Sequence, residues 1–188
     1  MSYFQNAGAL IVQVVFGLLL LIVVLRVLLQ LFRANFYNPI CQGLYRATNP
    51  VLMPLQKLVP SWRNLNVAGV ALAYVIALLW MLALLAMLGR SVGVVGLLVV
   101  AFAKLLDFTL SVFIWSIVIR AILSFVSADY EHPVVPPLMK ITDPILQPFQ
   151  RIIPAIGGFD VSPIVAILVL YLAQALVAQP LLDFGASL

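Results

Sequence analysis

Long apolar runs, with no alternation of polar and apolar positions, dominate this chain. A helix rises 1.5 Å per residue, so about 20 residues cross the roughly 30 Å of membrane hydrocarbon. Four stretches are long and apolar enough to do so: residues 8–32, 67–88, 93–126 and 163–178. A transmembrane β-barrel would alternate every second residue, which these runs do not. The pattern therefore predicts four membrane-spanning helices.

The third stretch is longer than one upright span needs. It also carries three charged residues, Lys104, Asp107 and Arg120. Its second part, 108–126, is predicted as the membrane core. The first part, 93–106, is either a tilted extension of the same helix or a separate segment at the interface.

Two polar, proline-rich loops, 33–66 and 127–162, separate the spans of each pair. With an even number of spans, both loops lie on one side of the membrane and both termini on the other. The loops contain Arg33, Arg46, Lys57, Arg63, Lys140 and Arg151, while the opposite face shows only Arg90. Because Lys and Arg favour the cytoplasmic side, we expect cytoplasmic loops and outer termini in a bacterial inner membrane.

The chain repeats itself at an offset of 94 residues, without a gap. The matched pairs include Arg26 with Arg120, Thr48-Asn49-Pro50 with Thr142-Asp143-Pro144, Pro54 with Pro148, Lys57 with Arg151, Pro60 with Pro154, and Asn66 with Asp160. Chance similarity between apolar segments would match Leu and Val rather than Pro. We therefore predict two units, 1–92 and 93–188, related in parallel because two helices precede the second copy.

Each loop contains a candidate amphipathic helix. In the second loop, Thr142 or Asp143 is expected to cap a helix that begins at Pro144, where the missing N–H costs nothing. Pro148 should kink this helix and Pro154 should end it. Apolar residues follow at helical spacing in both repeats: Ile145, Leu146, Phe149, Ile152 and Ile153, and earlier Val51, Leu52, Leu55, Leu58 and Val59. This apolar face lies either toward lipid or against the protein's own spans.

Composition supports a membrane protein and limits the chemistry. The 188 residues are 65% hydrophobic and 9% charged, with a mean hydropathy of +1.20, too few charges to cover a soluble fold. The net charge of +4 lies in topology-determining positions rather than basic runs, so no nucleic-acid partner is expected. One cysteine and one histidine leave no disulfide or His-based metal site. No catalytic constellation is visible, and we expect neither an enzyme nor a cofactor.

The second-half motif resembles the YggT family, also called YlmG, of bacterial and plastid membrane proteins. The resemblance covers nearly the whole chain and rests on Arg120, Thr142, Asp143, Pro144, Pro148, Arg151, Pro154, Gly157, Gly158, Asp160, Ser162 and Pro163. The first-repeat counterparts are Arg26, Thr48, Asn49, Pro50, Pro54, Lys57, Pro60 and Asn66. The first copy departs from the motif, because residues 61–64 replace the double glycine and an asparagine replaces the aspartate. Gln150 also stands where a second arginine is common in the family.

The resemblance implies links to osmotic and extracytoplasmic stress, ion balance, division, or assembly of membrane complexes, and no established enzymatic activity. Arg26 and Arg120 either snorkel to the membrane surface or pair with a carboxylate, Asp143 or Asp160. Lys104 and Asp107, three residues apart, are expected to form a local ion pair at the outer interface. The double glycine, Gly157-Gly158, is expected to form a turn with positive φ.

Two functions are compatible with this sequence. The preferred one is a non-enzymatic scaffold or assembly factor that binds other membrane proteins, or itself, through its loops. The alternative is a small oligomeric channel or transporter. Polarity is concentrated in the loops rather than in the spans, which favours the scaffold.

Overall fold

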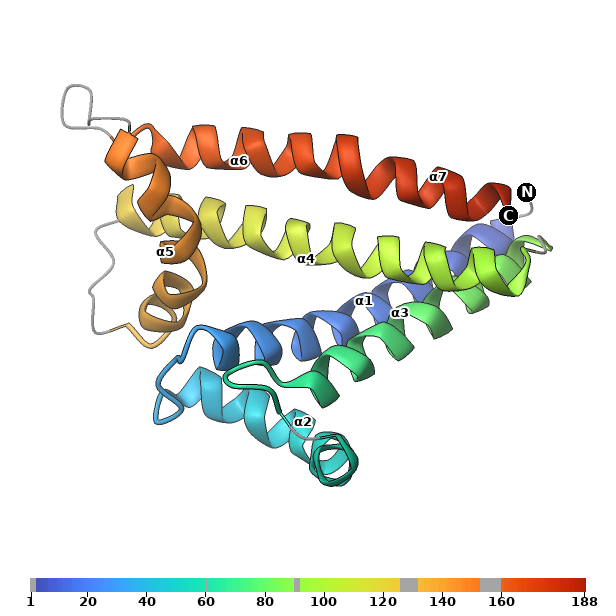
Figure 1. Cartoon of the computed structure of the whole chain (residues 1–188), viewed down its shortest axis with the longest axis horizontal. Helices are drawn as coiled ribbons and strands as arrows, with labels where there is room; N and C mark the ends of the chain where they lie inside the picture. Colours follow the sequence, from blue (N-terminus) through green and yellow to red (C-terminus); the bar gives the residue numbers. More distant parts are fainter. Residues whose placement is uncertain (1–2, 60, 90–91, 126–131, 153–159) are drawn as a thin grey trace.

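The computed structural model describes residues 3–59, 61–89, 92–125, 132–152 and 160–188 (Figure 1). In these ranges the chain is helical apart from connecting segments and one isolated bridge between Trp62 and Leu65. The elements are α1 (Tyr3–Leu31), α2 (Pro39–Leu58), α3 (Val67–Leu88), α4 (Val94–Phe125), α5 (Val135–Ile152), α6 (Ser162–Ala173), a π-helical turn η1 (Gln174–Ala178) and α7 (Gln179–Ser187).

Four helical segments in the described chain are long and apolar enough to cross a membrane. They are Asn6–Leu31, Val67–Leu88, Val94–Ser124 and Ser162–Ser187, the last formed by α6, η1 and α7 in continuous sequence. The all-α, polytopic architecture expected from the apolar runs is thereby confirmed.

The spans are arranged as two parallel units. In Figure 1, α1 and α4 run toward the end that carries α2 and α5, and α3 and α6–α7 return to the end that carries both termini. We call these the loop end and the terminal end. The spans converge at the terminal end and spread apart toward the loop end. Each unit is thus span, loop helix, span, which confirms the predicted repeat.

The fourth span extends beyond its expected limit of residue 178. The helix continues past Pro180 to Ser187. Pro180 lies at the start of α7, directly after the π-helical turn, where the regular pattern of hydrogen bonds is already interrupted. The third span is one unbroken helix, so residues 94–106 are an extension of it rather than a separate interfacial segment.

The loop helices begin earlier than expected, and the proposed caps at Thr142 and Asp143 are wrong. Helix α5 starts at Val135, so both residues and Pro144 lie inside it. The upstream residues Val135, Leu138 and Ile141 are buried at helical spacing, and this burial outweighs the one hydrogen bond that a proline removes. In the first repeat the cap is Asn38, whose side chain accepts hydrogen bonds from the backbone N–H groups of Ile40 and Cys41.

The apolar faces of the loop helices pack mainly against the spans. Leu52 on α2 and Leu146 on α5, which are equivalent at the 94-residue offset, are both fully buried. Leu146 belongs to a cluster with Ile114 and Ile117 of α4 and Ala166 of α6. Part of each predicted face stays exposed, including Val51 and Ile152. The central part of each apolar face therefore packs against the protein's own spans, which was one of the two predicted arrangements, rather than facing lipid.

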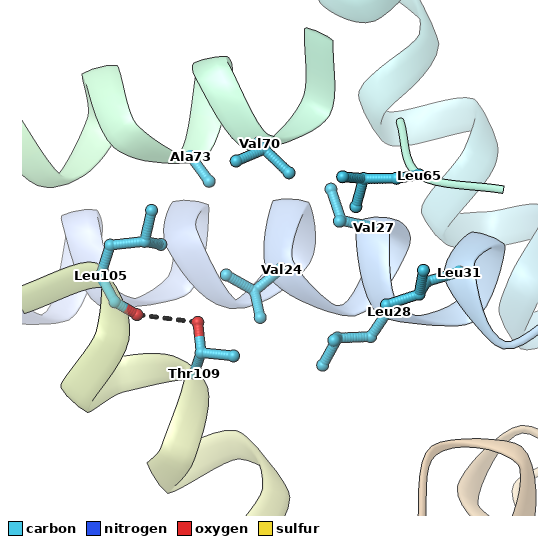
Figure 2. Close-up of a pocket in the computed structure, with 9 residues that line it drawn as sticks. All are labelled: Val24, Val27, Leu28, Leu31, Leu65, Val70, Ala73, Leu105 and Thr109. Atoms are coloured by element: carbon cyan, nitrogen blue, oxygen red, sulfur yellow. Dashed lines mark hydrogen bonds between the residues drawn. The ribbon is translucent and has the colours of Figure 1, made fainter. Parts of the chain in front are cut away.

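A cavity of about 200 Å³ lies where α1, α3 and α4 diverge (Figure 2). Its lining is apolar apart from one hydroxyl, that of Thr109, which donates a hydrogen bond to the carbonyl of Leu105 in its own helix. The other lining residues are Val24, Val27, Leu28, Leu31, Leu65, Val70 and Ala73. The side chains that line this space therefore offer an ion only one hydroxyl oxygen.

Glycines allow α4 and α7 to approach closely at the terminal end. A Cβ atom on Gly96 would lie 2.5 Å from the carbonyl oxygen of Gly185, and one on Gly185 would lie 2.9 Å from the backbone nitrogen of Val100. Close contact through small residues is a common way to pack helices in lipid, where the hydrophobic effect does not drive helices together.

Candidate functional site

The two intramembrane arginines occupy equivalent positions near the loop end of α1 and α4. A charged side chain within a span is costly, so such residues usually have a defined partner. Each arginine is close to the loop helix of its own repeat, but the two environments differ. Their comparison defines the candidate site.

Arg120 pairs with the motif on α5. Its Nη1 atom donates hydrogen bonds to Asp143 Oδ1 at 2.5 Å and to Thr142 Oγ1 at 2.6 Å. Thr142 is fully buried, and its hydroxyl donates in turn to the carbonyl oxygen of Leu138 at 2.9 Å. The guanidinium therefore joins α4 to α5 through a charge-assisted hydrogen bond and a hydroxyl fixed in orientation. Of the two predicted roles, snorkelling and pairing with a carboxylate, Arg120 therefore has the second, and its partner is Asp143.

Asp160 forms a second polar group beside the first, at the start of α6. Its carboxylate accepts hydrogen bonds from the backbone N–H and the hydroxyl of Ser162 and from Gln150 Nε2 on α5. Burial alone would raise the pKa of Asp160, but these hydrogen bonds and the positive charge of Arg120 hold that pKa below its ordinary value. Asp160 thus stays ionised and ties α5 to α6.

Arg26 has a different environment. It is only 5% exposed, and no carboxylate of the described chain lies within ion-pair distance. Its guanidinium carbon lies 4.8 Å from the ring centroids of both Phe36 and Tyr45. Nη1 donates to Gln30 Oε1 at 3.0 Å, while Nε has no hydrogen-bond partner among the described residues. Such burial does not match a side chain that snorkels to the surface.

Gln30 and Asn66 connect Arg26 to the next span. Gln30 Oε1 also accepts a hydrogen bond from Asn66 Nδ2 at 3.0 Å, and Asn66 Oδ1 caps α3 by accepting from the backbone N–H of Gly69. Asn66 is fully buried. It therefore stabilises the start of α3 just as its counterpart Asp160 stabilises the start of α6. The two positions keep one structural role with different charge.

A contact between the repeats joins the two loop helices. Asn38 Nδ2 donates to the carbonyl oxygen of Pro133 at 2.7 Å, just before α5 begins. Asn38 and His132 are equivalent at the 94-residue offset. The starts of α2 and α5 are thus adjacent, and both helices lie at the loop end of the molecule (Figure 1).

The remaining motif residues lie in the loop helices, at the start of α6 or outside the described residues. Four prolines lie inside helices: Pro50 and Pro54 in α2, and Pro144 and Pro148 in α5. Lys57 and Arg151 occupy the last turns of α2 and α5 and are exposed. Ser162 and Pro163 begin α6, and Thr48 is buried with the same hydrogen bond to the fourth preceding carbonyl as Thr142. Pro60, Pro154, Gly157 and Gly158 lie outside the described residues.

Sequence reasoning missed the aromatic contacts of Arg26. Phe36 and Tyr45 converge on it only because the chain turns between α1 and α2, and no spacing in the sequence indicates that turn. Gln30 could have been found, because it lies four residues after Arg26 on the same helix face. Gln150 stood out only as a departure from the family motif, yet it binds Asp160.

The polar contacts of this site position the loop helices on the spans. Among the described residues no three His, Cys, Asp or Glu side chains gather as a metal site would require. Cys41 is fully buried, and burial raises the pKa of its thiol, so the reactive thiolate is disfavoured. The site thus consists of two loop helices that are held against the spans and leave part of their outer faces exposed.

Comparison with known proteins matches this architecture. The sequence profile of the CCB3/YggT family matches residues 5–87 and 99–181, two segments whose limits differ by 94 residues at each end (99 − 5 and 181 − 87). A Pseudomonas aeruginosa protein of uncharacterised function is 38% identical over 179 residues, covering 94% of this chain and 91% of the relative.

A Vibrio alginolyticus protein, encoded in the region 3′ of proC and also uncharacterised, is 36% identical, covering 93% of this chain and 95% of its own. The uncharacterised YggT protein of Escherichia coli K12 is 29% identical over 182 residues, 96% of this chain and 94% of its own. No solved structure shows a significant match to the chain. With two consecutive matches to the family profile and relatives that align over most of their length, the chain belongs to the CCB3/YggT family.

Proposed function

We propose that this protein is a non-enzymatic scaffold or assembly factor of the bacterial inner membrane, acting in assembly or stress response. Its loop helices face the cytoplasm and bind another membrane complex. The orientation follows from the excess of Lys and Arg in the loops. The proposal rests on one observation: α2, α5 and the segments that flank α2 expose large apolar and aromatic side chains as well as cations.

Three of these side chains are large and apolar, yet most of their surface is exposed. Tyr37 is 88% exposed, Trp62 is 73% exposed and Ile152 is 78% exposed. Tyr37 precedes α2, Trp62 follows α2 and Ile152 ends α5, and the exposed cations Arg46, Lys57, Lys140 and Arg151 lie on these two helices. Aromatic residues and arginine are enriched where proteins bind one another, because they combine large contact area with directed hydrogen bonds. Ion pairs, caps and burial hold the helices underneath, so the surface is preorganised for binding.

The described spans offer little for conduction. Lys104, Asp107 and Gln174 contact one another rather than line a passage, and the cavity between α1, α3 and α4 is apolar. Ion pathways are built from rings of charged side chains or carbonyl groups. We therefore expect that protein reconstituted in liposomes passes no K⁺ or Na⁺ above the leak of empty vesicles.

Site-specific photo-crosslinking tests the scaffold directly. A photoreactive phenylalanine analogue placed at Tyr37, Trp62 or Ile152 in the full chain should attach the same protein from all three positions in native membranes. Leu10, an exposed residue of α1 far from the loop end, is the matched control and should give lipid adducts only. Absence of a common protein adduct, together with a saturable ion-selective flux, would overturn the proposal.

The second candidate is a small channel or transporter, favoured by one observation. Lys104 and Asp107 form an ion pair at 3.7 Å, ten or more residues inside α4, deeper than the outer interface where the sequence placed them. Charged side chains at such depth often mark ion or proton pathways. A flux in the liposome assay that is lost on Asp107→Asn would select this candidate.

A further inference from the structure

A polar cluster lies on α4 near the middle of its span. Lys104 Nζ lies 3.7 Å from Asp107 Oδ2 and 4.7 Å from the centre of the Trp80 ring on α3. On the other side of the cluster, Gln174 Nε2 of η1 donates to Asp107 Oδ1 at 3.1 Å and to Ser111 Oγ at 2.8 Å. The cluster thus joins three spans.

Its depth follows from the helix geometry. Gln174 lies twelve residues after Ser162, the first residue of α6, so about 18 Å of helix separates it from the loop end. Half of the hydrocarbon thickness is about 15 Å. Asp107, which Gln174 contacts, is therefore close to the middle of the bilayer, where exposed charge is most costly.

The cluster is incompletely satisfied within one chain. The Lys104 and Asp107 side chains are 24% and 27% exposed, and the 3.7 Å between them is too long for a hydrogen bond. Among the described residues Lys104 makes no hydrogen bond, and the buried indole N–H of Trp80 has none. Lipid cannot supply acceptors, so donors at this depth need them from protein.

Apolar residues extend this exposed face toward the loop end. At about 100° per residue, Lys104, Ser111, Trp115 and Ile122 fall within one narrow sector of α4. Trp115 is 64% exposed and Ile122 is 56% exposed. The neighbouring sectors are occupied, by Trp80 of α3 against Phe108 on one side and by Gln174 on the other. We call Lys104, Asp107, Ser111, Trp115 and Ile122 the α4 stripe.

We propose that the α4 stripe is the interface between two copies of this chain, related by a two-fold axis along the membrane normal. The stripe carries one positive and one negative charge at nearly the same depth. A partner with a single charge would leave net charge buried in lipid, whereas a second copy brings the complementary pair. Asp107 of each copy supplies acceptors to Lys104 of the other, as a self-complementary two-fold interface requires.

Cysteine crosslinking locates the interface. In a Cys41→Ala background, Ile122→Cys and Trp115→Cys should form disulfide-linked dimers in native membranes under a lipid-permeable oxidant. Phe102→Cys is the control, because Phe102 is 54% exposed on the opposite side of α4. Crosslinking at Phe102 and not at the stripe, or a monomer by native mass spectrometry from lipid nanodiscs, overturns the proposal.

Charge exchange shows whether the pair acts between copies. The double variant Lys104→Asp/Asp107→Lys keeps its ion pair within the chain and should dimerise with itself. It should co-purify with differently tagged wild-type chain about fivefold less than wild type does, the change that about 1 kcal/mol of interhelical polar contact produces. Equal co-purification would show that the charges do not meet across an interface. The double variant's own dimer verifies that it folds, and neither outcome depends on the partner of the loop helices.

Discussion

Arg120 Nη1 lies 2.5 Å from Asp143 Oδ1, and at the same position in the first repeat the carboxylate is replaced by the amide of Asn49. The duplication has thus kept the arginine in both repeats and changed what stabilises it. In the second repeat a carboxylate neutralises the cation, whereas in the first repeat two aromatic rings stabilise it without neutralising its charge. This difference can be measured.

Removing Arg120 should destabilise the protein. The variant Arg120→Ala leaves Asp143 partly buried without its cation, which we expect to cost about 1–3 kcal/mol of folding stability. Thermal unfolding in detergent micelles measures this loss. The second change Asp143→Asn, added to Arg120→Ala, should restore part of the stability, because no charge then remains unpaired. If the double variant is no more stable than the single one, the ion pair does not stabilise the contact between α4 and α5.

The aromatic ring of Phe36 should stabilise the protein mainly through the positive charge of Arg26. We expect Phe36→Leu, which keeps apolar volume and removes one ring, to cost about 1 kcal/mol through the lost cation–π interaction. In an Arg26→Met background the same change should cost less, because no cation remains above the ring. Thermal unfolding of wild type, the two single variants and the double variant gives the coupling energy, and a coupling of zero would contradict the cation–π role.

Asp160 should make stability depend on pH in the acid range. Its pKa is lower in the folded protein than in the unfolded chain, so its contribution is present above the unfolded pKa of about 4 and is lost as the pH falls toward the folded value. Melting temperatures of wild type and Asp160→Asn between about pH 3 and pH 7 measure this. The difference between them should shrink on acidification, and a constant difference would rule out this titration.

Alanine substitution at two glycines should have opposite effects. At Gly96 the new methyl group would meet the backbone of α7, and we expect a loss of about 1–3 kcal/mol. At Gly43, within α2, nothing lies within 4 Å of the added Cβ, so alanine should stabilise the helix by about 0.5–1 kcal/mol. Both are read from thermal unfolding. Destabilisation of equal size at both positions would contradict the close packing of α4 on α7.

Introduced cysteines should report the orientation of the chain. Cys41, the native candidate for such labelling, is fully buried and should not react from either side. In a Cys41→Ala background, a membrane-impermeant maleimide should label Ser187→Cys in intact cells and Ser61→Cys only after the membranes are opened. Both residues are exposed, at opposite ends of the molecule. The reverse pattern would place the loop helices outside and move the search for partners there.

The number of spans and the two-repeat order could be predicted. Each span is one continuous apolar run in the sequence, and the prolines that match at the 94-residue offset indicate the repeat. Helix α3 begins at Val67 and ends at Leu88, as the apolar run 67–88 predicts. The loop helices were harder, because their start depends on the burial of Leu138 and Ile141 against other helices. Prolines usually end helices, and tertiary packing overrides that local preference here.

The candidate site was predictable only in part. The sequence offers Asp143 as one of two carboxylates, with Asp160, that could pair with Arg120, and leaves snorkelling as the alternative. It does not show that Arg26 lies between Phe36 and Tyr45, because three chain segments meet there. Asp107 with Gln174 is a similar case, joining residues 67 positions apart in the sequence.

The π-helical turn at Gln174–Ala178 sets the rotational phase of everything that follows it. Such a turn accommodates one more residue than an α-helical turn, so the side chains of α7 are rotated by about 100° relative to an unbroken helix. Gly185 faces α4 because of this offset. Straightening the turn into a regular α-helix of the same sequence would rotate Gly185 away and direct a bulkier neighbour at Val100, whereas deleting one residue within the turn would keep Gly185 toward α4. The turn therefore accommodates one extra residue, and the fourth span contacts the third at two points, through the amide of Gln174 midway along α4 and through bare backbone near the end of α7.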